Sequence, residues 1–166
     1  MSNTFEILTR GLCPYGGKKW YEGDVQHLRS GDVVIRPKRC SDGLGYYVDP
    51  ETVSFYAQRT DKNGKHVFVG DIVFYHDKEE DCVDLFVVEY DEENVAFCMG
   101  DKTREVLPSA ETFSADCEVV GNKWQDKELY ERIIKVAELP RAERGAAREE
   151  LAKWTPYFTA GKEARQ

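Results

Sequence analysis

The side chains that most often bind metal ions or carry acid–base chemistry are scattered along this sequence. Its three histidines, His27, His66 and His76, are far apart, and none has a second ligand at the short spacing of a zinc site. His76 precedes an acidic run, "DKEEDCVD" at residues 77–84, which could gather a cation. A calcium loop, however, needs a glycine at its turn, and this run has none. We therefore expect no metal site.

Gly-Lys and Gly-Asp pairs occur twice, in the similar stretches "GKKWYEGDV" at 17–25 and "NGKHVFVGDIVFY" at 63–75. Gly-Lys can bind phosphate, but "NGKHV" lacks the spacing of a phosphate loop and does not open a helix. The two aspartates could be paired acids, although aspartate after glycine at a bend is more often structural. We interpret the second stretch as a hairpin turn, a strand and a glycine bend, and the first as a looser copy. The residues with this structural role are Gly23, Asp24, Asn63, Gly64, Gly70 and Asp71.

No pattern typical of an enzyme is present in the chain. The sequence lacks the Gly-x-Ser-x-Gly nucleophile elbow and the glycine-rich dinucleotide fingerprint. Its five cysteines are scattered without a Cys-x-x-Cys pair, which predicts small buried thiols rather than disulfides or a zinc knuckle. We expect a protein that is not an enzyme and that has no cofactor.

The formal net charge of −8 opposes broad binding to a phosphate backbone. One basic run, "RPKRC" at 36–40, supplies the candidate phosphate contacts Arg36, Lys38 and Arg39. No apolar run approaches the roughly 20 residues of a membrane helix, and the first residues lack the features of a signal peptide. We therefore expect a cytoplasmic protein that does not contact a membrane, with nucleic acid as a less favoured partner.

Aromatic residues form 12% of the chain, and several are adjacent pairs. One member of such a pair must face outward on a regular strand. Exposed tyrosine or tryptophan favours a binding surface for a protein or a planar ligand, whereas inward-facing rings belong to the core or to subunit contacts. The candidate binding aromatics are Trp20, Tyr21, Tyr46, Tyr47 and Tyr56.

The elements that must position these residues are mostly short strands. Apolar runs separated by Gly, Asp, Asn and Pro predict strands within 31–37, 45–49, 52–58, 83–90, 94–100 and 116–122. Helix formers follow, and predict one helix after an N-cap at Asp126 and a second from Pro140 onward. We expect a mainly β protein of the α+β class: a β domain over 1–124, built as a small, strongly bent antiparallel sheet or an SH3-like barrel, C-terminal helices over 125–155, and a tail over 156–166. Leu151 and Trp154 could contact the body or another chain, so a homo-oligomer is expected.

Residues 46–75, "YYVDPETVSFYAQRTDKNGKHVFVGDIVFY", resemble the central motif of the YopX proteins of phages and prophages. The later stretch "CEVVGNKWQDKELYE", 117–131, is similar to the closing strand and short helix of that family, and "TRGLCPYGGKKWYEGDV" is loosely similar to its start. The resemblance spans about residues 5–131 and leaves out the chain from about Pro140. It implies a small, mainly β, phage-encoded cytosolic protein, and it transfers no enzymatic activity to any residue.

The leading functional hypothesis is a non-enzymatic phage protein that binds a host protein, such as a defence or nucleic-acid-processing protein. Small size, acidity and the viral family motivate it. Two alternatives stay open: an accessory or regulator of phage DNA metabolism that binds nucleic acid through "RPKRC", and a protein that sequesters a small ligand among its aromatic residues.

Overall fold

The computed structural model describes residues 6–39, 43–100 and 105–154. The chain divides into two compact units, residues 1–58 and 59–166. This boundary lies inside the stretch 1–124 that the sequence suggests as one β domain. The expected tail, 156–166, lies outside the described residues.

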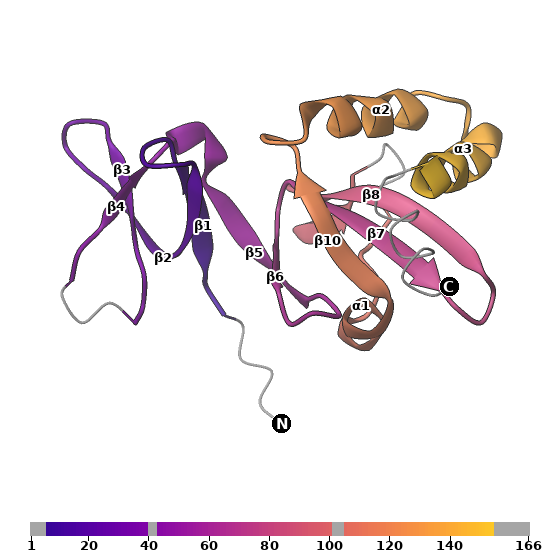
Figure 1. Ribbon diagram of the computed structural model, residues 1–166, viewed down its shortest axis with the longest axis horizontal. Helices are drawn as coiled ribbons and strands as arrows, with labels where there is room; N and C mark the ends of the chain where they lie inside the picture. The colour runs from indigo at the N-terminus through magenta and orange to yellow at the C-terminus, as the bar shows by residue number, and fades with distance from the viewer. Residues whose placement is uncertain (1–5, 40–42, 101–104, 155–166) are drawn as a thin grey trace. The chain divides into compact units, whose positions relative to one another are not determined.

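The first unit supplies the strands β4-β3-β2-β1-β5, in this order, to an antiparallel sheet in which β6 (His66–Phe68) follows β5 (Figure 1). Its elements are β1 (Thr9–Cys13), β2 (Lys19–His27), β3 (Val33–Arg36), β4 (Tyr46–Val48), the short 3-10 helix η1 (Pro50–Thr52) and β5 (Ser54–Thr60), which begins in this unit.

The sheet of the first unit is bent so strongly that β4 lies close to β1. The amide of Asp49 donates to the carbonyl of Leu12 at 2.9 Å, just after β4 ends. Gly11 makes this approach possible, because a Cβ atom there would lie 2.7 Å from the side chain of Val48. The concave side holds a small core of Val33, Ile35 and Val48, against which Tyr21, Val25 and Val53 pack.

The second unit contains an antiparallel sheet with the order β10-β7-β8-β9 and three helices. Its elements are β6 (His66–Phe68), β7 (Asp71–Asp77), β8 (Cys82–Asp91), β9 (Ala96–Met99), α1 (Ala110–Asp116), β10 (Cys117–Asn122), α2 (Lys127–Ala137) and α3 (Arg141–Trp154). Figure 1 shows α2 and α3 together, on the side of the sheet away from α1.

Both faces of this sheet are buried, which explains why the sequences of β7 and β8 are continuous apolar runs. On one face, Leu85 and its neighbours pack against Ile133 of α2 and Ala152 of α3. On the other face, Phe86 meets Phe113 of α1 edge to face, with ring centroids 6.4 Å apart. The helices therefore cover the strands on two sides.

The mainly β, α+β class with C-terminal helices is confirmed. The described strands form two antiparallel sheets, and neither closes into a barrel, so the bent sheet is observed and the SH3-like barrel is not. Helix α1 is an addition to the expected elements, and the side chain of Ser109 caps it by accepting from the amide of Thr112 at 3.2 Å. None of the described helices is long and apolar enough to cross a membrane.

Candidate binding surfaces

The Asp61–Lys65 turn is hydrogen-bonded to the edge strand β10. The carboxylate of Asp61, which is 2% exposed, accepts from the amides of Asn63 and Lys65 at 2.9 Å. Its second oxygen accepts from the amide of Val119 in β10 at 3.0 Å. Gly64 takes φ of 78°, which is a conformation that favours glycine. The turn therefore covers a strand edge and leaves its Gly-Lys pair no phosphate-binding geometry.

Gly70 and Asp71 form a bend between β6 and β7. Gly70 has φ of 90°, its amide donates to Val88 at 2.7 Å, and its carbonyl accepts from Lys123 at 2.9 Å. The ring of Trp124 lies so close that a Cβ atom on Gly70 would be 2.6 Å from it. Asp71 is 1% exposed and accepts from the amide of Phe68 at 2.9 Å. The buried aspartate holds the bend.

The first Gly-Asp pair has a different structural role. Gly17, like Gly64, lies in a turn with positive φ, here 104°. Gly23, by contrast, lies inside the continuous strand β2, where a Cβ atom would be 2.0 Å from the carbonyl oxygen of Arg36. Asp24 is exposed. The two copies share the turn, but Gly23 lies within a strand and allows close approach of the neighbouring strand.

The strand register separates the candidate aromatics of the first unit onto two faces of its sheet. Tyr21 and Tyr46 stack with ring centroids 3.8 Å apart and an interplanar angle of 7°, and Tyr21 packs on the core. Trp20 projects from the opposite face, where the guanidinium of Arg10 lies 4.2 Å from its ring centroid. The stacked tyrosines are thus half-buried, on the side of the sheet that holds the core.

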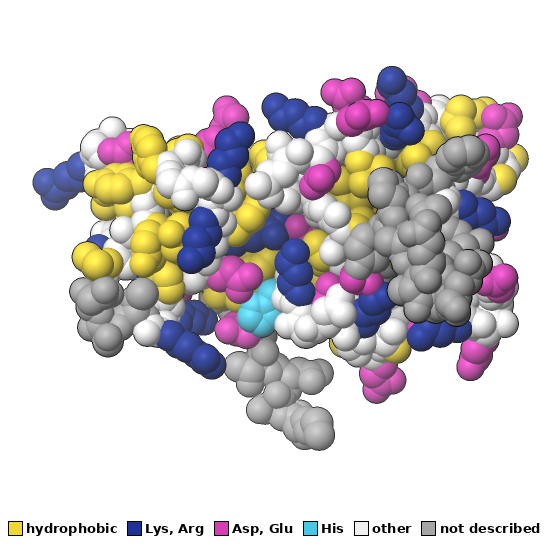
Figure 2. Space-filling view, in the orientation of Figure 1, with side chains coloured by type: hydrophobic (Ala, Val, Ile, Leu, Met, Phe, Trp, Pro, Cys, Tyr) yellow, Lys and Arg dark blue, Asp and Glu magenta, His cyan; other side chains and the backbone are white. Residues whose placement is uncertain are grey.

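Four candidate residues project from the face opposite the core of the first unit, which we call the outer face: Trp20, Arg36, Tyr47 and Tyr56. Paired residues share a face, and the pairs Arg10–Glu22, Arg10–Ser54, Asp24–Arg36 and Val34–Tyr47 give this assignment. Tyr47 is 52% exposed and Arg36 is exposed, whereas Trp20 and Tyr56 are half-buried. Hydrophobic side chains are visible at the surface of these strands, at the left of Figure 2.

The basic run that follows β3 is only partly available to a partner. Arg36 donates to the carbonyl of Gly43 at 3.1 Å, and the Lys38 ammonium lies 3.5 Å from the Glu6 carboxylate. Arg39 is exposed. Residues 1–58 contain seven Lys and Arg and seven Asp and Glu, so this unit is neutral and the whole net charge of −8 belongs to residues 59–166. The first unit is neutral, and Arg36 and Lys38 already contact other residues of the chain, so it gives little support to nucleic-acid binding.

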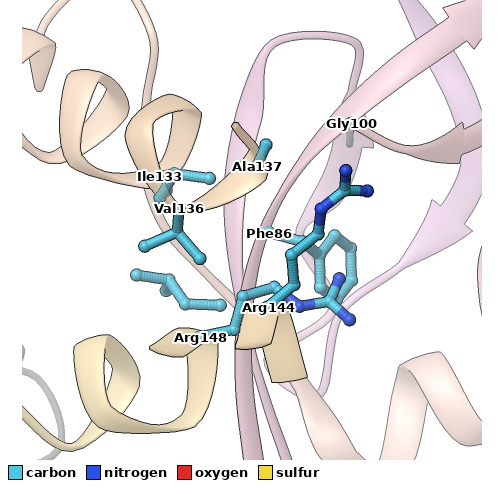
Figure 3. A pocket seen from close by; sticks show the side chains of 8 residues that line it. Phe86, Gly100, Ile133, Val136, Ala137, Arg144 and Arg148 are labelled. Atoms are coloured by element: carbon cyan, nitrogen blue, oxygen red, sulfur yellow. The ribbon is translucent and has the colours of Figure 1, made fainter. Parts of the chain in front are cut away.

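A small apolar hollow between the sheet and helices α2 and α3 is bordered by two arginines (Figure 3). Its volume is about 10 Å³, which is room for a single water molecule at most. Arg148 lies 3.4 Å from the carboxylate of Asp84 in β8, and Arg144 donates to the carbonyl of Leu139 at 2.7 Å. The arginines therefore attach α3 to its neighbours, as do the half-buried Leu151 and the buried Ala152. Trp154 ends α3, and its side chain lies outside the described residues.

Sequence reasoning missed an acidic groove in the second unit, with a volume of about 600 Å³. Its walls are the β8–β9 hairpin and the C-terminal part of α2, and it is lined by Glu89, Tyr90, Asp91, Glu92, Glu93, Cys98, Gly100, Ile134, Ala137 and Glu138. The run "YDEEN" at 90–94 looks like an ordinary solvated loop in the sequence, and only the fold brings Ile134 and Glu138 beside it.

Two buried or half-buried groups of the second unit have strongly raised pKa values. Burial raises the pKa of the Cys117 thiol to about 12, and burial followed by the charge of Asp77 raises the pKa of Tyr75 to about 12. Among the residues that the structure describes, no three His, Cys, Asp or Glu side chains are grouped so that they could hold a metal ion.

The comparison with known proteins concerns the second unit most of all. No match is found among curated proteins. The family model described as YopX protein matches residues 46–131, which is more than half of the chain. The match contains the Asp61 turn, the Gly70 bend, the strand β10 that the Asp61 turn contacts and the Lys123 that Gly70 contacts, but not the first Gly-Asp pair at 23–24. The chain therefore belongs to the YopX family.

Proposed function

We propose that this protein is a phage-encoded, non-enzymatic binding protein that acts in the host cytoplasm on a host protein, and that it inhibits a defence or nucleic-acid-processing protein. The single observation that carries the proposal is the outer face of the first unit. Three aromatic side chains and one arginine share that face: Trp20, Tyr47, Tyr56 and Arg36.

The composition of the outer face supports a protein partner. Tryptophan, tyrosine and arginine are the side chains that dominate binding energy at protein interfaces, because each combines a large apolar area with a polar group. Tyr47 is 52% exposed, so a partner can still bury part of its side chain. Because this unit is neutral, it adds no long-range repulsion of its own toward an acidic partner.

The proposal is tested by affinity capture from a lysate of the phage's host, with quantitative mass spectrometry. The wild-type chain should enrich one host protein reproducibly, and Tyr47→Ala should lose most of it. Phe55→Ala is the matched control, because Phe55 is also exposed, at 58%, but projects from the opposite face of the same sheet. Equal recovery with Tyr47→Ala and with the wild type would overturn the role of the outer face. Recovery of nucleic acid alone would overturn the host-protein assignment.

A further inference from the structure

The outer face of the first unit contains a charged side chain that is almost completely buried. Arg10 is 4% exposed, and its guanidinium lies 4.2 Å from the centroid of the Trp20 ring. Its Nε donates to the Oγ of Ser54, which is also buried, at 3.2 Å. Arginine is seldom buried unless its charge has partners, and the aromatic face and the hydroxyl are two of them. Burying this charge costs desolvation free energy, which an apolar residue at the same position would not.

The strand register holds Arg10 between Ser54 and Trp20. Arg10 pairs with Ser54 on β5 and with Glu22 on β2, and Trp20, two residues before Glu22, is its diagonal neighbour. The planar guanidinium lies over the indole while its Nε–H donates to Ser54, and the compact ammonium of a lysine has no planar fork to do both. Ser54 thus orients the guanidinium, and the guanidinium orients the ring of Trp20. A ring that is fixed before binding loses less conformational entropy when a partner covers it.

The guanidinium of Arg10 also determines which group can pack on this ring. It covers one face of the half-buried Trp20 and is itself too buried to meet a partner, so a partner contacts the rest of the ring. The attraction of the covered face for a cation is satisfied within the chain, and the fixed positive charge opposes a second cation on the far side of the indole. The exposed Glu22 offsets part of this repulsion, but it draws a partner cation to itself rather than to the ring. An uncharged apolar group meets no such opposition.

We propose that Arg10 is a positioning residue for binding. It fixes the indole of Trp20 on the outer face, and it makes the exposed part of that ring a contact for an apolar side chain of the host protein rather than for a lysine or arginine. The inference rests on the proposed function, because it names the chemical group that the outer face receives at Trp20. Tyr47 stands on another strand of the same face and has no part in this contact.

The experiment is nuclear magnetic resonance of the full chain, following the indole N–H signal of Trp20, which is assigned by its loss in Trp20→Phe. Two probes of nearly the same shape are titrated: neopentyl alcohol, which is neutral, and tetramethylammonium, which is a cation. Neopentyl alcohol should shift the Trp20 signal, and tetramethylammonium should shift it at least about threefold less, since one ring face already holds a cation.

Two variants test the contact itself. Arg10→Leu removes the cation, and Ser54→Ala removes only the hydroxyl that accepts from Nε, so the second variant serves if the first does not fold. Both should move the Trp20 indole signal, while the signal of Trp124, whose ring lies 4.8 Å from the Lys123 ammonium in the second unit, should stay unchanged. Recovery of the host protein from lysate should fall about fivefold with Arg10→Leu and about twofold with Ser54→Ala.

The outcomes separate this inference from the proposed function. A Trp20 signal that is unchanged in both variants would overturn the positioning role of Arg10, and equal shifts from the two probes would overturn the preference for an apolar group. Undiminished recovery of the host protein by both variants would refute the link to binding, while the proposed function would stand. Recovery of no host protein by the wild type, together with the expected signals, would refute the proposed function and support the role of Arg10 at Trp20.

Discussion

Replacing Gly70 with alanine should destabilise this protein more than the same replacement at Gly64, although both glycines have positive φ. Gly70 has φ of 90° and Gly64 has φ of 78°, so each alanine pays about 1–2 kcal/mol for a left-handed conformation. At Gly64 no atom lies within 4 Å of the added Cβ. At Gly70 the Cβ would lie 2.6 Å from two carbons of the Trp124 ring. Overpacking of that kind costs about 1–3 kcal/mol more.

The backbone at Gly70 cannot shift easily to relieve this contact, because its amide and its carbonyl are both hydrogen-bonded, to Val88 and to Lys123. We therefore expect Gly70→Ala to lower the free energy of unfolding by about 2–5 kcal/mol and Gly64→Ala by about 1–2 kcal/mol. The assay is urea unfolding followed by circular dichroism, with midpoint and slope compared for each variant.

A double-mutant cycle identifies the Trp124 ring as the cause. Combining Gly70→Ala with Trp124→Leu should cost less than the sum of the two single changes, by about 1 kcal/mol or more, because the smaller side chain leaves room for the methyl group. Equal losses for Gly64→Ala and Gly70→Ala, or an additive cycle, would show that the ring contact at Gly70 does not constrain the fold.

Three further predictions concern the second unit. Asp61→Ala removes the acceptor of three backbone amides, including that of Val119, and should cost about 3 kcal/mol; hydrogen exchange at the Val119 amide should accelerate accordingly. Val95 is a β-branched residue with φ of 50° and is 73% exposed, so Val95→Gly should raise the thermal midpoint by relieving about 1 kcal/mol of strain; an unchanged midpoint would refute this. Burial raises the pKa of Cys117 from 9.0 to about 12, so the unfolded chain loses this proton at a lower pH than the folded chain does. The free energy of unfolding should therefore fall as pH rises from about 9 to 12, by about 1.4 kcal/mol per pH unit. Urea titrations across that range should show a less steep fall for Cys117→Ala.

The fold was largely predictable from sequence where one local signal decides the structure. Proline, glycine and aspartate mark the ends of most strands, and helix formers after residue 124 mark the C-terminal helices. Helix α1 was not predicted because it has only seven residues, and its Ser109 cap is weak beside the surrounding strand pattern. The role of the first Gly-Asp pair was less predictable, since a glycine inside a strand can serve a bend or a close strand approach, and the close approach at Gly23 depends on the position of Arg36.

The candidate binding residues were less predictable, because which face of a strand is covered depends on register and packing. Tyr46 and Tyr47 are adjacent and equivalent in the sequence, yet one stacks on Tyr21 and the other is exposed. The acidic groove was beyond sequence reasoning for another reason. Glu89 and Glu138 are far apart along the chain, and the packing of α2 beside the β8–β9 hairpin brings them together.

The most direct test of the account is calorimetric titration of the captured host protein, once purified, with the wild-type chain, Tyr47→Ala and Phe55→Ala. The account predicts that Tyr47→Ala weakens binding about thirtyfold, as for a residue worth about 2 kcal/mol at an interface, while Phe55→Ala changes the affinity less than about twofold. Equal affinities for all three proteins would contradict a binding function of the outer face.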